Sequence, residues 1–105
     1  TAVANDYSYD VIYSRMIDGI GKKEDALVGI STSGNSKNIV LAMEKANEKG
    51  LTTIAITGKS GGKLKDIAKY CIAVDSIDTP RIQECHILIG HIICQLVEEK
   101  IFNQT

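Results

Sequence analysis

A turn rich in hydroxyl groups and glycine, residues 31–36 (STSGNS), offers the clearest chemistry in the chain. A short apolar run precedes it and an amphipathic segment follows, so we expect a strand to enter this serine turn and a helix to leave it. The first amides of a helix have no partner within the helix, and the helix dipole adds partial positive charge there. Hydroxyls from Ser31, Thr32, Ser33 and Ser36 can donate to phosphate oxygens beside those amides. The spacing predicts a phosphate site, and a serine-rich helix cap without a ligand is the simpler alternative.

The serine turn differs from the two common nucleotide-binding fingerprints. It lacks the Gly-Lys pair of a P-loop and the three-glycine spacing of a dinucleotide-binding turn. Gly34 allows the backbone to approach a ligand closely and to adopt a left-handed conformation. We therefore expect a phosphorylated small molecule at this turn and no nucleotide cofactor.

A second turn, residues 58–63 (GKSGGK), repeats part of this chemistry and is called the glycine turn below. It also follows a β-branched run, so both turns are expected at the carboxyl ends of parallel strands, where they could line one crevice. Lys59 and Lys63 could help to hold an anion there. Solvated lysines flanking a turn are the more common arrangement, and we favour that interpretation.

The elements that must position these turns alternate between strand and helix. Apolar residues three and four apart predict helices, and short β-branched runs predict strands. The expected order is helix 10–20, strand 27–30, helix 35–49, strand 52–57, helix 63–69, strand 70–74 and helix 79–102. This alternation is typical of an α/β fold with three layers, a parallel sheet flanked by helices, and we expect residues 1–105 to form a single domain.

Composition argues against several functional classes. The 105 residues carry a formal net charge of −1, which gives no electrostatic footprint for nucleic-acid binding. No apolar run is long enough to cross a membrane, and no basic segment followed by an apolar one opens the chain. The three cysteines have no paired spacing and are expected to be reduced thiols in a cytoplasmic protein.

Both ends of the chain indicate further contacts. The sequence begins at Thr1, without Met, and continues at once with apolar residues, so we interpret the domain as incomplete at its N-terminus. The helix expected at 79–102 is apolar on more than one side. In so small a chain this pattern indicates contacts between subunits, and we expect a homo-oligomer.

Three segments together resemble the sugar isomerase (SIS) domains. They are residues 29–36 (GISTSGNS), residues 57–63 (TGKSGGK) and residues 81–86 (RIQECH), the last followed by His91. Within that family the resemblance is strongest to the phosphoheptose isomerases, and it covers essentially the whole chain. The serine turn is common to many SIS domains, whereas a histidine eight residues after Gln83 is far more specific. The resemblance implies a flavodoxin-like SIS fold and a phosphorylated seven-carbon sugar as ligand.

The same resemblance implies substrate-binding roles near the serine turn. Ser31, Ser33 and Ser36 would hold the sugar phosphate, with Thr32 near the sugar. Asp6 would face the substrate from a polar turn near the start of the chain.

Gln83 and His91 belong to the active centre by this resemblance, with His91 as the acid–base group and both as ligands in members that bind zinc. On pattern alone, a histidine within an apolar helix is more often a core residue. The two residues lie about 80° apart around the helix and about 12 Å apart along it, so they meet at one ion only by leaning together. In the family a catalytic Glu and a further His ligand precede the position of Thr1, so a zinc site depends on residues outside this sequence.

The second histidine of the helix, His86, is expected to have a different task. It lies about 140° from His91 around the helix, so we do not expect the two to serve one centre in the same chain. We interpret His86 as structural or as a contact with a neighbouring subunit.

The activity implied by the resemblance is the aldose–ketose isomerisation of sedoheptulose 7-phosphate to D-glycero-D-manno-heptose 7-phosphate, for lipopolysaccharide or capsule synthesis, in a homotetramer. Such a reaction needs a base and a group that moves protons among the sugar oxygens. Histidine suits the second task because it titrates near neutral pH. A non-catalytic SIS protein that senses phosphosugars or binds the replication initiator DnaA is one alternative, and an isomerase of six-carbon sugar phosphates is another.

Overall fold

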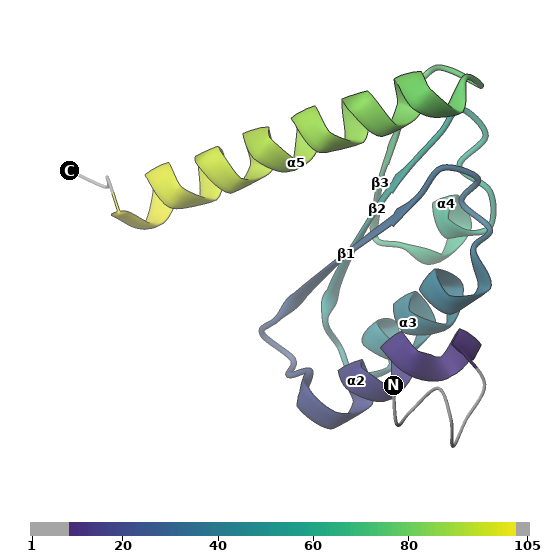
Figure 1. The fold of residues 1–105 in the computed structure, drawn as a ribbon. Coiled ribbons are helices and arrows are strands. Elements are labelled where there is room, and N and C mark those ends of the chain that lie inside the picture. The colour runs from purple at the N-terminus through teal and green to yellow at the C-terminus, as the bar shows by residue number, and fades with distance from the viewer. Residues whose placement is uncertain (1–8, 103–105) are drawn as a thin grey trace.

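The computed structural model describes residues 9–102 and contains a three-stranded parallel sheet with helices on both sides (Figure 1). Every helix and strand expected from the sequence is present, although the helix expected at 10–20 begins as a 3-10 turn. The order is η1 (Tyr9–Val11), α2 (Ile12–Ile20), β1 (Ala26–Ser31), α3 (Lys37–Glu48), β2 (Thr52–Thr57), α4 (Leu64–Ile67), β3 (Tyr70–Ala73) and α5 (Thr79–Phe102). The α/β prediction is confirmed.

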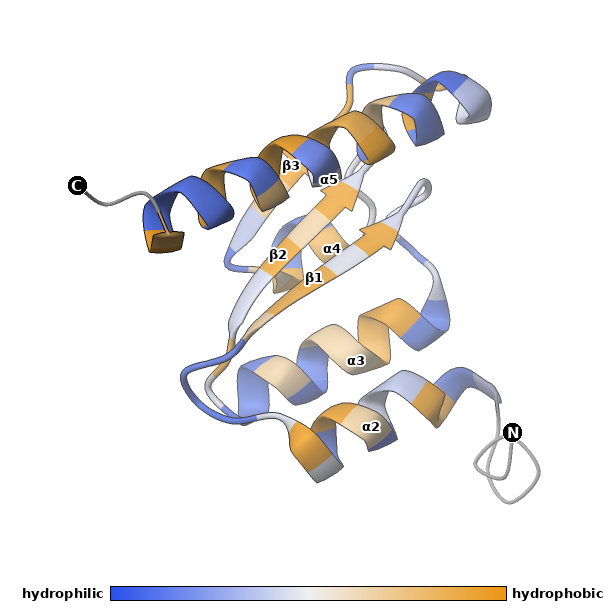
Figure 2. Cartoon of the chain, turned by 60° about the vertical axis from the view of Figure 1, so that its left-hand side comes forward, coloured by the Kyte–Doolittle hydropathy of each residue, from blue (hydrophilic) through white to orange (hydrophobic). Residues whose placement is uncertain are grey.

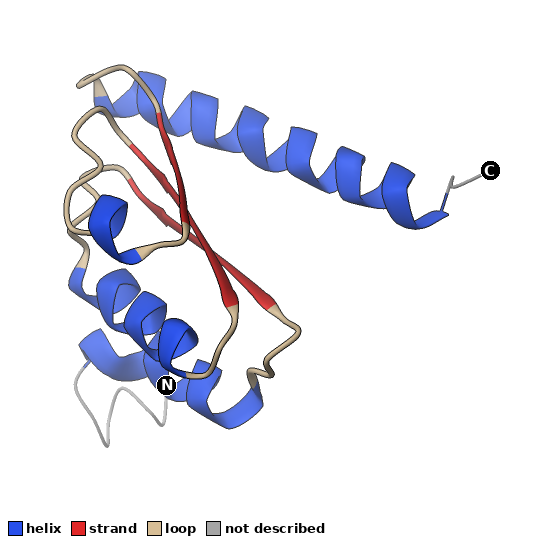
Figure 3. Cartoon of the chain, turned by 180° about the vertical axis from the view of Figure 1, so that it is seen from behind, coloured by secondary structure: helices blue, strands red, loops and turns tan. Residues whose placement is uncertain are grey.

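The sheet has the strand order β1-β2-β3, with every pair parallel. Ser31 pairs with Thr57, and Thr57 pairs with Ala73, so the three strands end level. The serine turn and the glycine turn therefore leave the same edge of the sheet side by side. Helices α2, α3 and α4 lie on one side of the sheet, and α5 crosses the other side (Figure 3).

The core between the sheet and α3 is small and tightly packed. Met43, Ala55 and Leu64 are fully buried and form its centre. A Cβ added to Gly29 would lie 2.7 Å from the Met43 Cε atom, so the absence of a side chain there lets α3 pack directly on β1. This contact fixes the distance between the middle of α3 and β1.

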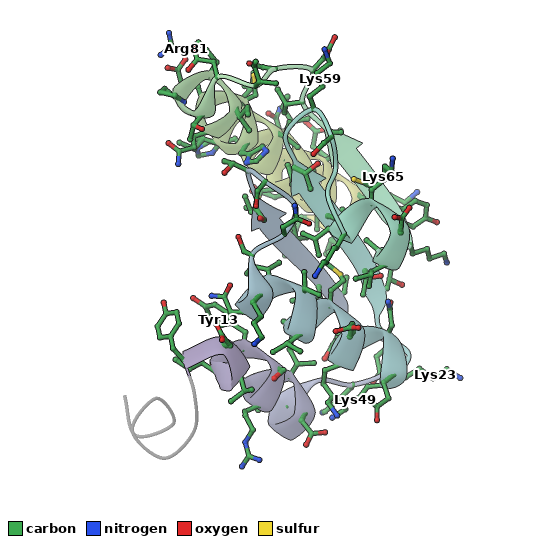
Figure 4. All side chains as sticks on the ribbon, turned by 90° about the vertical axis from the view of Figure 1, so that its right-hand side faces the viewer. Tyr13, Lys23, Lys49, Lys59, Lys65 and Arg81 are labelled. Carbon is green, nitrogen blue, oxygen red and sulfur yellow. The ribbon has the colours of Figure 1, made fainter. Side chains whose placement is uncertain are left out.

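Two hydrogen bonds from the Lys49 side chain, at the end of α3, hold α2 against α3. The Lys49 Nζ atom donates to the carbonyl oxygens of Asp18, at 2.6 Å, and of Ile17, at 3.3 Å. Figure 4 shows Lys49 beside the end of α2. A lysine ammonium at this place satisfies carbonyl groups that the last turn of a helix leaves unpaired.

A polar network joins α3, β2 and the segment after α4. The buried Thr53 hydroxyl donates to Asn47 Oδ1 at 2.8 Å and accepts from the Lys69 backbone N–H at 2.9 Å. The Asn47 amide donates in turn to the Ile67 carbonyl at 2.9 Å. One hydroxyl therefore supports the crossover between β2 and β3.

We expect Thr53→Val to lower the free energy of unfolding by about 1–3 kcal/mol, because it leaves the Lys69 N–H without its partner. Urea denaturation measures the change. Thr52→Val is the matched control, since the half-buried Thr52 side chain points to the other face of the sheet. Equal effects of the two substitutions would contradict the importance of the network.

Helix α5 touches the sheet only near its start. Its buried residues are Ile82 and His86, and the remainder extends beyond the strands (Figure 1). The hydropathy colouring of Figure 2 shows apolar residues along this extension, and seven of them are exposed, namely Ile87, Leu88, Ile92, Leu96, Val97, Ile101 and Phe102. Within residues 9–102, no helix combines the length and apolar character needed to span a membrane.

Candidate functional site

The serine turn connects β1 to α3 through a sharp bend. Ser31 ends the strand with 5% of its surface exposed, and Gly34 adopts a left-handed backbone with φ of +72°. Ser36 is the N-cap residue of α3. The turn thus places hydroxyls and the first amides of a 12-residue helix at the carboxyl end of the sheet.

Hydrogen bonds among the hydroxyls set their direction. The Ser31 Oγ atom accepts from the Gly34 N–H at 3.1 Å and from the Ser36 N–H at 3.4 Å. The Ser31 Oγ atom also lies 2.7 Å from the Ser36 Oγ atom and 3.4 Å from the Ser33 Oγ atom, and either hydroxyl of each pair can donate. When Ser31 donates to Ser36, the Ser36 proton is available for an acceptor outside the turn.

The N-cap residue of α3 does not cap the helix with its own side chain. The Ser36 side chain makes no hydrogen bond to the first turn of the helix, because it is engaged with Ser31. The geometry thus weakens the simpler alternative, in which the serines only cap the helix. The Ile39 N–H donates to the Asn38 Oδ1 atom at 2.9 Å, so the amides of Lys37 and Asn38 are those of the first turn that keep the capacity to bind an anion.

The glycine turn packs directly on the serine turn. A Cβ added to Gly34 would lie 2.1 Å from the Gly61 carbonyl oxygen, and one added to Gly62 would lie 2.4 Å from the Ser33 carbonyl oxygen. The Leu64 N–H donates to the Gly34 carbonyl at 3.0 Å. The glycine turn therefore contacts and stabilises the serine turn on the side that faces α4.

The two lysines of the glycine turn line different cavities. Lys59 lines a second cavity with Thr32, Ser33 and Lys65, whereas Lys63 lines a third, on the side of α3 and α4. The two turns thus share a crevice, as expected, but neither lysine lines the cavity that contains His91. This placement favours the interpretation of both as solvated lysines.

A cavity of about 700 Å³, called the main cavity below, lies between the serine turn and α5. Ile30 and three hydroxyl residues line one wall, and one stripe of α5 forms the other. The stripe consists of residues at intervals of three and four, as one face of a helix requires: Gln83, His86, Ile87, Gly90, His91 and Cys94.

The structure brings together most of the residues that the resemblance singled out. Ser31, Thr32 and Ser36 face Gln83 and His91 across the main cavity, and both α5 residues are exposed. These five come from three different elements of the chain.

One expected site residue, Ser33, lies outside the main cavity, and another, Asp6, lies outside the described residues. Ser33 lines the second cavity, and its Oγ atom accepts from the Asn35 N–H at 3.0 Å. Asp6 lies outside the described residues, so its expected position facing the substrate stays a prediction.

His86 and His91 both line the main cavity, but the His86 Nε2 atom is bonded to the Thr57 carbonyl, which agrees with the interpretation of His86 as structural. Their separation of about 140° around the helix places them at opposite margins of one stripe rather than on different faces. The 3–4 spacing of the residues between them, with Ile87 and Gly90 at the middle, is the signal that could have revealed the shared wall. Cys94, the last residue of that stripe, was also missed.

The main cavity offers few ligands for a metal. Within residues 9–102, no three or more His, Cys, Asp or Glu side chains lie close enough to hold an ion together. Gln83 and His91 supply two donors, and the His86 Nε2 atom is engaged with a backbone carbonyl. Because structural and catalytic zinc sites need three or four protein ligands, the described residues do not form one by themselves.

The main cavity can accept a molecule with an anionic end and a polar chain. Hydroxyls and helix amides at one wall suit a phosphate, and an amide and an imidazole at the other wall suit hydroxyl or carbonyl oxygens. A cavity at the carboxyl ends of parallel strands, bordered by this serine turn, is the arrangement that the resemblance to SIS domains implies.

Comparison with known families agrees with this resemblance. The model of the SIS domain matches residues 1–58, and the chain belongs to this family. Its relatives include the phosphoheptose isomerases of Akkermansia muciniphila, 55% identical over 97% of this chain and 54% of that protein, and of Clostridium acetobutylicum, 52% identical over 99% of this chain and 53% of that protein. The chain thus spans about half the length of these curated relatives.

Solved structures give the same result at the level of the fold. The phosphoheptose isomerase GmhA from Neisseria gonorrhoeae has a TM-score of 0.87 with 41% identity, over 91% of this chain and 55% of that chain. A phosphoheptose isomerase from Francisella tularensis has a TM-score of 0.89 with 36% identity, over 93% of this chain and 53% of that chain.

Proposed function

We propose that this chain is part of a phosphoheptose isomerase that converts sedoheptulose 7-phosphate to D-glycero-D-manno-heptose 7-phosphate. The observation that carries the proposal is the main cavity, in which the serine turn and His91 occupy opposite walls. The names and identities of the relatives support the choice of a seven-carbon sugar.

The proposed reaction divides the work between the two walls. The serine turn and the start of α3 hold the phosphate, so the open-chain sugar extends toward α5. Gln83 donates to an oxygen of the sugar and fixes its orientation. His91 exchanges a proton with the sugar oxygens while a carboxylate from outside the described residues moves the proton between adjacent carbons. The reaction thus passes through an enediol.

The experiment that tests this activity incubates the full-length protein with sedoheptulose 7-phosphate in D₂O. We expect the aldose product, with deuterium at its second carbon, because a proton moved by a base through an enediol exchanges with solvent. Binding without turnover would favour a phosphosugar sensor or a DnaA-binding regulator. Faster turnover of a six-carbon ketose phosphate would favour the other isomerase class.

The phosphate role of the serine turn has its own test. Ser36→Ala should weaken the binding of sedoheptulose 7-phosphate by about 10–100-fold, because a hydrogen bond to a charged group contributes about 1.5–3 kcal/mol. Titration calorimetry measures the affinity. Ser60→Ala, in the second cavity, is the matched control and should leave it unchanged. A larger loss of affinity for Ser60→Ala than for Ser36→Ala would indicate that the phosphate binds in the second cavity and would contradict the proposal.

Zinc is a further proposal. Gln83 and His91 would be two of its ligands, the remainder coming from outside the described residues, and we assign no step of the reaction to the metal. Metal analysis of the purified full-length protein, compared with a Gln83→Ala variant, tests it. Equal zinc content in both proteins would contradict the assignment of Gln83.

We also propose a homotetramer in the cytoplasm that supplies heptose for lipopolysaccharide or capsule. The seven exposed apolar residues of α5 support an interface along this helix. Light scattering of the full-length protein measures the oligomeric state, and a monomer would contradict this part of the proposal.

A further inference from the structure

His86 links α5 to the sheet through a buried hydrogen bond. The residue is only 4% exposed, and its Nε2 atom lies 2.9 Å from the Thr57 carbonyl oxygen at the end of β2. The same oxygen accepts from the Val74 N–H at 3.0 Å, so both of its lone pairs are used.

This contact assigns the position of the ring proton. A carbonyl oxygen only accepts, so the His86 Nε2 atom carries the hydrogen. The neutral ring then keeps a lone pair on Nδ1. His86 also lines the main cavity.

Two buried side chains, Ile82 and His86, connect α5 to the sheet, and this contact is called the joint below. Ile82 packs under the glycine turn, where a Cβ added to Gly58 would lie 2.9 Å from the Ile82 Cδ1 atom. His86 follows one turn later, and these are the two buried residues of a 24-residue helix. Beyond this joint, α5 leaves the sheet (Figure 1).

His91 lies beyond the joint and depends on it for its position. It is about 7 Å further along the helix axis than His86, so a tilt of about 10° at the joint would move it by about 1 Å. A displacement of that size at a reacting group costs about 10²-fold in rate. Ile82 supplies apolar contact, which has no fixed direction, whereas the hydrogen bond of His86 is directional and resists such a tilt.

We propose that His86 is a positioning residue of the main cavity, and this proposal rests on the proposed isomerase function. Its Nε2–H anchors α5 to the Thr57 carbonyl, which holds Gln83 and His91 opposite the serine turn. The serine turn is built by β1 and α3, so it does not depend on this anchor.

The test compares two substitutions of His86 in the full-length protein. His86→Leu fills the space without a donor, and we expect kcat for sedoheptulose 7-phosphate to fall about 10²-fold while KM changes little. In His86→Gln, the amide N–H takes the place of Nε2–H and should restore most of kcat. Glu84→Gln, on the exposed side of α5, is the control and should leave both constants unchanged. Unchanged kcat in His86→Leu, or equal losses in the Leu and Gln variants, would overturn the proposal.

A second measurement needs neither turnover nor a variant that folds. In the unmodified full-length protein, ¹⁵N NMR of the imidazole nitrogens should show His86 as the Nε2–H tautomer. The Nδ1–H tautomer, or a mixture of the two, would overturn the anchor. Absence of turnover in the unmodified protein would refute the isomerase function instead, and the NMR result would still decide the anchor.

Discussion

His91→Gln in the full-length protein is expected to reduce turnover of sedoheptulose 7-phosphate by about 10²–10⁴-fold, the usual contribution of a general acid–base group. Glutamine retains a hydrogen-bonding side chain of similar size but cannot take up and release a proton near neutral pH. In the proposed function the serine turn, on the opposite wall of the main cavity, holds the phosphate. We therefore expect the affinity for the sugar phosphate, measured by calorimetry, to change little.

The control for this variant is Gln95→Leu, an exposed position one turn further along α5 and outside the main cavity. Turnover should be unaffected by it. If His91→Gln retained full turnover, the assignment of His91 as the acid–base group would be wrong. If it lost affinity and turnover equally, His91 would be a binding residue.

Gly34→Ala is expected to have the largest effect on both stability and binding. A side chain at φ of +72° costs about 1–2 kcal/mol, and the added Cβ would lie 2.1 Å from the Gly61 carbonyl oxygen. Because both partners are backbone, the two turns must separate, and the Leu64–Gly34 hydrogen bond breaks with them. We expect a loss of about 3 kcal/mol or more, a fall in Tm above about 10 °C, and no measurable sugar phosphate binding.

The matched control is Gly19→Ala near the end of α2, where an added Cβ meets nothing within 4 Å. Alanine there should raise the free energy of unfolding by about 0.5–1 kcal/mol, because alanine has a higher helix propensity than glycine. Calorimetric melting measures both variants. A Gly34→Ala protein as stable as the unmodified one would mean that the two turns do not pack as described.

The order of strands and helices could be predicted from the sequence because each element carries its own local signal. The β-branched run of β2 and the 3–4 spacing in α3 are visible within a few residues. The serine turn was predictable for the same reason, since strand, hydroxyls, glycine and helix follow one another without interruption. Even the pairing of Ser36 with Ser31, rather than with the helix, changes only the detail of that turn.

The contacts between distant segments could not be predicted in this way. The packing of Gly34 on Gly61 joins two turns from different crossovers, and no local pattern specifies it. The presence of both His86 and His91 in the wall of the main cavity was missed, because an angle around a helix says nothing about how wide a cavity that helix covers. Both depend on where the sheet places its strand ends, which is a property of the whole fold.

The central claim is that the main cavity binds the sugar phosphate between the serine turn and α5. A crystal structure of the full-length His91→Gln protein with sedoheptulose 7-phosphate tests it most directly, because slow turnover keeps the substrate in place. We predict the phosphate at the Ser31 and Ser36 hydroxyls and the start of α3, with the sugar beside Gln83 and residue 91. A phosphate found instead in the second cavity, beside Lys59 and Lys65, would contradict the claim.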